Sequence, residues 1–323
     1  MNASRTYLFL LFIFAGSTSF SQSFRNPNSW RLQRHEFTLS VGASNFMSDL
    51  GGRDMIGSDF LWDLEFSKTR PAAGLSYMYY LSETLGWRTG FQWGWLEGDD
   101  KLTAEPFRMN RNLNARTQIY EMYTWLEWNF LRQKGGNRYG LRSHHTGRRI
   151  GAKRRGIGMY LFAGFGGTYF NPKGNQGNGW VALKPLHTEG QGLPGGPSQY
   201  SGFTATLPMG FGLRRSMGQF WSIGLRFSYR FTFSDYLDDV SGVYYDPTEL
   251  GNAYGAQSVA MADPSLGMAI GAPDIPPTSP GQQRGDITDK DGYMFAQLTV
   301  TYRPKWRPKG RGRYRRTYYR SSF

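Results

Sequence analysis

Apolar and polar side chains alternate along several segments of the chain with a period of two residues. From Trp87 to Trp95 the odd-numbered positions are Trp, Thr, Phe, Trp and Trp, and the even-numbered ones between them are Arg, Gly, Gln and Gly. The stretch from Trp221 to Phe233 sets seven large apolar residues against Ser, Gly, Arg and Thr. This period places neighbours on opposite faces of a strand. An apolar face backed by a polar one is typical of a barrel in a lipid membrane.

Eight segments alternate in this way, and their connectors fall into two classes. The connectors at 81–86 and 215–219 are short and four others are long, while the connector 132–155 is the exception, because it is long but falls on the side of the short ones. Because bacterial barrels have an even number of strands and long loops on one side, we predict an all-β fold. It is an eight-stranded antiparallel up-and-down transmembrane β-barrel over residues 35–302 with long extracellular loops. The predicted strands are 35–44, 72–81, 86–97, 117–131, 156–170, 202–214, 220–234 and 291–302, and the long outer connectors are 45–71, 98–116, 171–201 and 235–290.

The N-terminal residues have the layout of a secretory signal peptide. Arg5 precedes an apolar run over 7–15, and small residues follow it. We expect residues 1–21 to be removed on export and residues 22–34 to form a periplasmic segment. No stretch is long and apolar enough to cross a bilayer as a helix, so strands would have to span the membrane. The predicted location is the bacterial outer membrane, with lipid as the first partner.

Composition supports this fold and removes several kinds of chemistry. Aromatic residues make up 16% of the chain, and 42 of the 323 residues are Gly. The absence of Cys excludes disulfides, thiol catalysis and thiolate metal sites. A core of this kind must be held by packing and backbone hydrogen bonds.

The net charge of +14 is concentrated in two segments. The connector at 132–155 and the tail at 303–323 each carry nine Lys or Arg and no acidic residue. Without these eighteen, 20 basic residues remain against 24 acidic ones. Both segments fall on the predicted periplasmic side, where nucleic acid is absent. They are either solvated linkers or docking elements for an acidic protein surface. The candidate partner-binding residues are Arg148, Arg149, Lys153, Arg154, Arg155, Trp306, Arg313, Arg315 and Arg316.

Charged residues also occupy inward positions of the predicted strands. An eight-stranded barrel is narrow enough to be filled by its own side chains, and buried charges must be paired. We therefore predict an ion-pair network that plugs the lumen; a narrow proton or ion path is the alternative. The candidate residues are Arg88, Glu121, Glu127, Arg214, Arg226 and Arg230.

Acidic pairs in the predicted outer loops raise the question of catalysis. Asp99 and Asp100, Asp238 and Asp239, and His187 all fall there, and some outer-membrane proteases place acid pairs and a His on such loops. No nucleophile with a positioned base is recognisable, however. Aspartates at strand ends commonly bond the backbone of turns, and this is the role expected of the second pair. We predict no enzymatic activity and no small-molecule substrate.

A metal site is the other candidate for the acid-rich stretch near the longest loop. Its carboxylates do not match the twelve-residue calcium loop with its central Gly and closing Glu. We therefore predict no bound metal and no cofactor. The carboxylates considered are Asp235, Asp238, Asp239, Asp246 and Glu249.

Several blocks of the sequence resemble a known family. They are "HEFTLSVGASNFMSDLGG", "TRPAAGLSYMYYLSETLGWRTG", "RNLNARTQIYEMYTWLEWNFL" and "FSDYLDDVSGVYYD", which together cover most of residues 35–302. The chain is similar in these blocks to PorG-like outer-membrane β-barrel proteins of Bacteroidota, which are associated with the type IX secretion system. The resemblance implies a non-enzymatic membrane anchor or assembly component that contacts periplasmic secretion-ring proteins. A small transport or lipid-binding barrel without a secretion role is the alternative.

Overall fold

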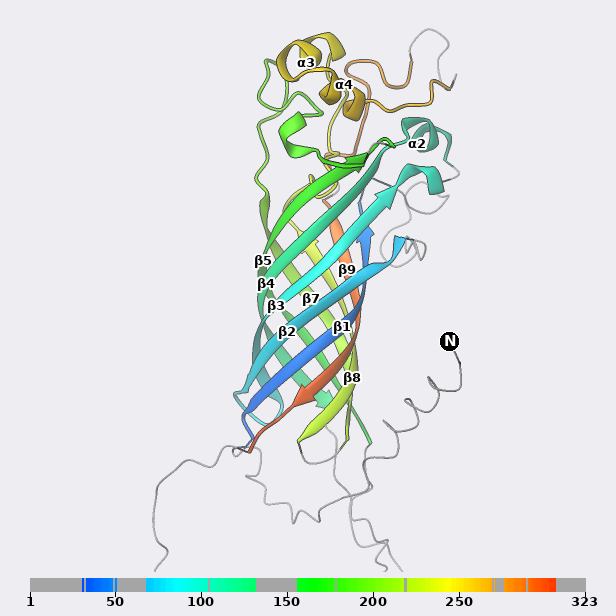
Figure 1. Ribbon diagram of the computed structural model, residues 1–323. Helices are drawn as coiled ribbons and strands as arrows, with labels where there is room; N and C mark the ends of the chain where they lie inside the picture. Colours follow the sequence, from blue (N-terminus) through cyan, green and yellow to red (C-terminus); the bar gives the residue numbers. More distant parts are fainter. Residues whose placement is uncertain are drawn as a thin grey trace, which may run out of the picture.

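The protein forms a closed antiparallel β-barrel in the computed structural model (Figure 1). The predicted fold class is confirmed. The structure describes residues 31, 33–48, 50, 68–103, 105–131, 156–177, 179–217, 220–268, 270, 276–288 and 290–305.

Eight strands make up the barrel wall, and a ninth is added at one end. The sheet order is β4-β3-β2-β1-β9-β8-β7-β5-β6, and β4 also pairs with β5, which closes the ring. Each strand of the ring is therefore hydrogen-bonded on both sides, and no ring strand is left as an edge. The strands are β1 (His35–Met47), β2 (Arg70–Tyr80), β3 (Leu85–Asp99), β4 (Asn114–Leu131), β5 (Ile157–Asn175), β6 (Trp180–Ala182), β7 (Phe203–Ser216), β8 (Trp221–Thr232) and β9 (Gly292–Tyr302).

Burial alternates along the strands as the sequence pattern predicts. On β3, Trp87 and Phe91 are exposed while Arg88 and Gln92 are buried. The outer wall carries large apolar side chains that would be costly to leave in water: Met122 is 72% exposed and Phe165 is 71% exposed. An exposed apolar wall around a polar interior is the arrangement of a barrel in a lipid bilayer. Among the described residues, no helix is long and apolar enough to span a membrane.

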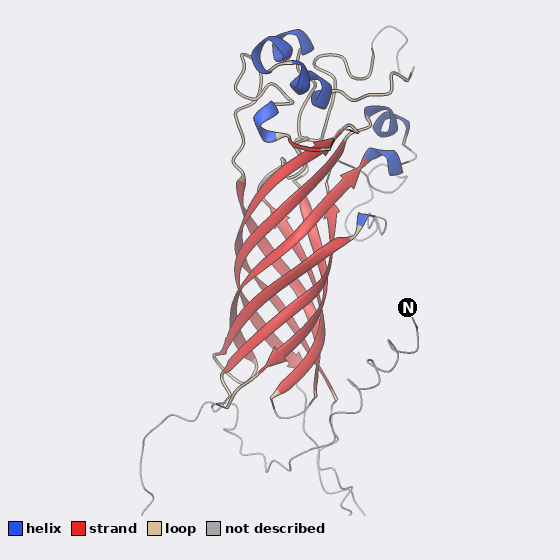
Figure 2. Ribbon diagram, in the orientation of Figure 1, coloured by secondary structure: helices blue, strands red, loops and turns tan. Residues whose placement is uncertain are grey.

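The two ends of the barrel differ. At the turn end, the tight turn of residues 81–84 joins β2 to β3, and β1 begins where β9 ends (Figure 1). At the opposite end, the cap end, several helices and ordered loops rise above the strands (Figure 2). These helices are η4 (Asp100–Leu102), α2 (Pro106–Arg111), η5 (Lys184–Leu186), α3 (Pro247–Tyr254) and α4 (Ala256–Ala262).

The cap end is more ordered than the sequence pattern predicts. β5 continues to Asn175 and pairs there with the short strand β6, and the connector 235–290 holds two helices. The basic connector 132–155 and residues 306–323 lie outside the described residues, as do residues 1–30.

Candidate functional site

The lumen at the turn end is filled by a network around Glu36, which is fully buried. Glu36 Oε1 accepts a hydrogen bond from Arg88 at 2.7 Å, and Glu36 Oε2 accepts from Arg303 at 2.6 Å and from Arg214 at 3.2 Å. The hydroxyl of Tyr80 also donates to Glu36 at 2.9 Å. Three cations therefore surround one carboxylate.

Glu127 is the second carboxylate of this network. It is paired with Arg88 at 3.0 Å and with Arg214 at 2.7 Å. The network thus links β1, β3, β4 and β7 across the lumen, and Arg303, which follows β9, joins it from the chain end. Charge pairs this deeply buried compensate for their lost hydration only when hydrogen bonding is nearly complete. At the turn end, this network of ion pairs fills the lumen.

Aromatic side chains fill the middle of the lumen. Trp125 is stacked between Tyr123 and Phe162, with ring centroids 4.1 and 4.3 Å apart. Arg226 lies over the Trp125 ring at 5.3 Å, a cation–π contact. These groups are buried together, so the centre of the barrel is a packed core.

A second ion pair lies nearer the cap end. Arg230 is 3.1 Å from Glu121, and both are fully buried. Thr206 also donates to Glu121, at 3.3 Å. Arg226 does not belong to an ion pair within the described residues: its guanidinium donates to Gln297 at 3.2 Å. In this respect the predicted network is wrong, because which inward groups meet depends on how the ring closes.

Three members of the turn-end network were missed in the sequence. Glu36 lies on the inward face of the first strand with Thr38 and Ser40, so its face could have been assigned from the pattern. Tyr80 could have been assigned in the same way. Arg303 comes one residue after the last strand but continues the inward positions Thr299 and Thr301, and its N–H still donates to the carbonyl of Phe220 at 2.8 Å. Extending the alternation by one residue would have found it.

The acid-rich segment after β8 closes the cap end. Leu237 is fully buried in an apolar cluster with Phe46, Ile119 and Phe295. Its backbone is held on both sides, because its carbonyl accepts from Thr117 and its N–H donates to Asp291 at 2.8 Å. This segment is therefore a plug set into the barrel mouth.

The two aspartates that follow Leu237 have different roles. Asp238 accepts from the N–H of Val240 at 2.9 Å, which is the turn-capping role expected of it. Asp239 instead accepts from Thr188 and Tyr200, both at 2.6 Å, and has a positive φ of 68°. It ties the connector 235–290 to the connector 171–201, so the local role expected of Asp239 is wrong.

The other candidate catalytic residues are also occupied structurally. Asp99 caps η4 through the N–H of Lys101, and Asp100 pairs with Arg111 at 2.7 Å. His187 stacks on Tyr254 with centroids 4.3 Å apart. Among the described residues, no cluster of His, Asp or Glu could hold a metal ion.

Arg284 is the central cation of the cap. It lies 2.8 Å from Glu189 and donates to the carbonyl of Asp239 at 2.7 Å. Its own carbonyl accepts from Arg111. Glu189 in turn accepts from the N–H of Ser241 at 2.9 Å. The cap is thus a folded unit with a buried polar core.

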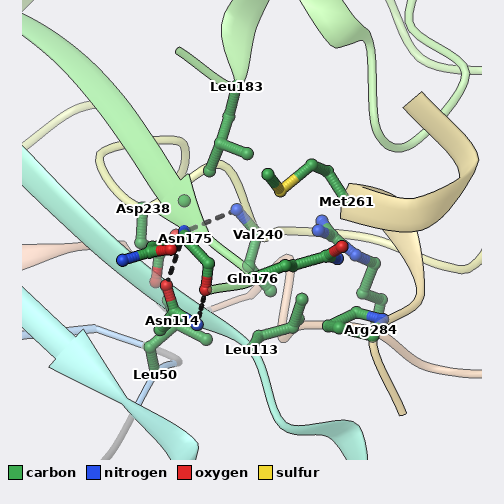
Figure 3. A pocket seen from close by; sticks show the side chains of 12 residues that line it. Leu50, Leu113, Asn114, Asn175, Gln176, Leu183, Asp238, Val240, Met261 and Arg284 are labelled. Atoms are coloured by element: carbon green, nitrogen blue, oxygen red, sulfur yellow. Dashed lines mark hydrogen bonds between the residues drawn. The ribbon is translucent and has the colours of Figure 1, made fainter. Parts of the chain in front are cut away.

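A small crevice lies beneath the cap, between the ends of β4 and β5 and the plug (Figure 3). Asn114 and Asn175 bond each other across one wall, each contact being 2.8 Å long. The crevice has room for about one water molecule. It is too small to bind an organic substrate.

Burial raises the pKa of Asp239 to about 6, although Arg284 and the two hydroxyl donors favour its charged form. The folded cap therefore binds a proton at Asp239 more tightly than the unfolded chain does. The resulting stabilisation is fully present below about pH 4 and is lost as the pH rises through about 6.

We expect the cap to open more readily at pH 7 than at pH 4.5, by roughly 2 kcal/mol. Hydrogen exchange of residues 235–250, corrected for the intrinsic rate at each pH, measures this opening. Asp239→Asn should remove most of the dependence. Asp246→Asn, which changes an exposed helix cap, should leave it intact; an unchanged pH profile in Asp239→Asn would contradict this account.

Comparison with known proteins gives one family and several structures. Residues 22–138 match a family model described as a domain of unknown function, DUF6089. No curated protein matches.

Solved structures similar to this chain include three bacterial barrels. Ail, the attachment invasion locus protein of Yersinia pestis, in complex with the heparin analogue sucrose octasulfate, is 11% identical, with 84% of this chain and 99% of that chain covered and a TM-score of 0.34. Neisserial surface protein A is 7% identical, with 84% of this chain and 96% of that chain covered and a TM-score of 0.34. The outer membrane protein OprG of Pseudomonas aeruginosa is 8% identical, with 84% of this chain and 97% of that chain covered and a TM-score of 0.33. Likenesses at this level carry no argument about function, and the fold assignment rests on the strand pairing.

The fold and the lumen together define a class of protein. It is an eight-stranded barrel of the outer-membrane type, with a lipid-facing wall, a filled interior and a plugged cap end. The candidate partner-binding residues lie outside the described residues, and they stay a prediction. They are Arg148, Arg149, Lys153, Arg154, Arg155, Trp306, Arg313, Arg315 and Arg316.

Proposed function

We propose that this barrel is a non-enzymatic outer-membrane anchor that holds a periplasmic protein through its basic segments. In this proposal the cap end faces the cell exterior and the turn end faces the periplasm. Connectors that hold helices at one end, and the short links 81–84 and 217–220 at the other, support this orientation. The basic connector 132–155 follows β4 at the turn end and would lie in the periplasm.

The observation that carries the proposal is the contact of Arg303 with Glu36. Arg303 is the first residue of the basic tail 303–323. It donates to Glu36 at 2.6 Å, and its guanidinium lies 4.4 Å from the ring centroid of Tyr80. The start of the tail is therefore fixed to the rigid lumen network. A partner bound to the tail would therefore be attached to the barrel wall through Arg303, as the proposed anchor role requires.

The resemblance of four sequence blocks to PorG-like barrels supports one kind of partner. We propose that the partner is a component of a type IX-like secretion machine, with an acidic surface that meets the basic tail and connector. Oppositely charged surfaces speed association and fix orientation. Binding of this kind weakens as salt screens the charges.

Site-specific crosslinking in intact cells tests the proposal. A photo-crosslinker at Arg313 in the tail should capture a periplasmic secretion-ring protein, and replacing Arg313, Arg315 and Arg316 with Gln should reduce secretion. The matched control replaces Lys290, an exposed cation of the cap, with Gln. The proposal would be refuted if a strain that lacks this protein secreted normally and the crosslinker captured no secretion-ring component.

Transport through the lumen is the second candidate function. The buried Arg230–Glu121 pair and the Trp125 stack oppose it, because they occupy the path that a solute would need. Purified barrel in planar bilayers should therefore give no stable open steps. Regular single-channel conductance in the unmodified protein would favour a transport role.

A further inference from the structure

Near the cap end, the outward face of β4 and β5 carries a charged pair, an amide pair and an aromatic pair in succession along the strands. Arg116 is directly opposite Lys173 in the strand register, and the next outward pair towards the turn end is Gln118 and Asn171. Tyr120 and Tyr169 form the pair after that. We call these six residues, Arg116, Lys173, Gln118, Asn171, Tyr120 and Tyr169, the β4–β5 stripe.

The top pair of the stripe places two cations side by side. Like charges directly opposite each other on one face are destabilising. Arg116 is paired with Glu97 at 2.8 Å and lies 4.2 Å from the ring centroid of Trp180. Within the part of the chain that the structure describes, no carboxylate pairs with Lys173. The position therefore suits an additional anion.

Neighbouring cations add to this excess. Lys68 and Arg70 also converge on Glu97, at 3.1 and 2.7 Å, and Lys68 lies 3.1 Å from Asp99. Two described carboxylates thus face four cations when Lys173 and Arg116 are included. Such a cluster carries a net positive charge at the level where the wall meets the cap.

The other two pairs of the stripe, further from the cap end, could contact the uncharged parts of an amphiphilic ligand whose anionic group binds the cations. Gln118 and Asn171 are half-buried, and their side chains make no hydrogen bond with the described residues, so their amides are available to hydroxyl or carbonyl groups. The rings of Tyr120 and Tyr169 lie 6.4 Å apart and are exposed. Aromatic rings with polar tips favour the boundary between headgroups and acyl chains.

Spacing along the stripe supports a single ligand. Four residues along a strand cover about 13 Å, or roughly 10 Å along the membrane normal for a strand tilted by about 40°. The cations therefore lie about 10 Å from the aromatic pair along the membrane normal, a distance that a lipid headgroup can span. Below that pair, the exposed Met122 and Phe165 offer an apolar wall to acyl chains.

We propose that the β4–β5 stripe binds a phosphorylated glycolipid of the outer leaflet, of the lipid A class. Its phosphate meets Lys173 and Arg116, its sugar amides and hydroxyls meet Gln118 and Asn171, and its acyl chains lie on the wall below. The inference rests on the proposed orientation, with the cap end at the cell surface. It concerns the lipid-facing wall, and the basic periplasmic segments have no part in it.

The test uses the purified full-length barrel and defined vesicles. Protein reconstituted into phosphatidylcholine vesicles that contain lipid A, dephosphorylated lipid A or phosphatidylglycerol is extracted gently, and retained lipid is counted by native mass spectrometry. Lipid A should be retained about tenfold better than its dephosphorylated form, as one charge-assisted phosphate contact implies. Lys173→Gln should remove most of this preference, and Lys173→Arg should keep it.

Arg215→Gln is the matched control, because Arg215 is an exposed cation of β7 at the turn end. It should leave retention unchanged. Equal retention of dephosphorylated lipid A, equal retention of phosphatidylglycerol, or no effect of Lys173→Gln in a folded barrel would each overturn the proposal. Because the assay contains no periplasmic protein, its failure is distinct from failure of the crosslinking experiment.

Discussion

Glu36→Gln should destabilise the barrel by about 3 to 5 kcal/mol, the usual cost of removing one partner from a buried ion network. Glutamine keeps the shape of the side chain but removes its charge. Arg88 and Arg214 then keep their contacts with Glu127, whereas Arg303 loses its carboxylate partner among the described residues. The urea midpoint of the purified barrel in lipid, followed by Trp fluorescence, measures the loss.

Two further variants make this result specific. Glu249→Gln changes an exposed carboxylate on α3 and should alter stability by less than about 0.5 kcal/mol. Adding Arg303→Met to Glu36→Gln removes one of the uncompensated cations, so the double variant should be more stable than the sum of the single changes predicts. Strict additivity would show that Arg303 is not coupled to Glu36.

Arg284→Met should open the cap while leaving the barrel folded. It leaves Glu189 buried without its cation and removes the donor to the carbonyl of Asp239. The expected loss is again about 3 to 5 kcal/mol, but confined to the cap. Protease cleavage within residues 235–290 should rise about a hundredfold or more, while the barrel keeps its heat-modifiable migration on gels.

Lys290→Met is the matched control for the cap. Lys290 lies 3.9 Å from Asp235 with its side chain 48% exposed, a geometry that contributes little to stability. Its cleavage rate should stay close to that of the unmodified protein. Equal cleavage in Arg284→Met and Lys290→Met would mean that the cap does not depend on the buried pair.

The strands of the wall could be predicted from the sequence because lipid and lumen impose opposite chemistry on alternate residues. Their cap ends could not. Pro172 and Gly174 suggest that β5 ends near residue 170, yet the strand continues to Asn175 because β6 and the plug pack against it. The helix α3 could have been found: Asp246 caps it, Pro247 begins it, and Glu249 follows at the third helical position.

The candidate site was predictable only as far as single strands allow. The inward positions of Arg88, Glu127 and Arg214 follow from the alternation, and the structure brings these three together. Which groups meet across the lumen depends on ring closure, which the period of two does not encode. Arg226 therefore lies against Gln297 and Trp125, and Arg303 joins from beyond the last strand.

The pairing of β1 with β9 has a consequence for the timing of biogenesis. The first and last strands of the wall meet from Phe37 opposite Tyr302 to Met47 opposite Gly292. The ring therefore cannot be completed until the final strand has been translocated, and Arg303 reaches Glu36 only after that step. A protein that binds the tail in this fixed position would bind finished barrels and pass over assembly intermediates.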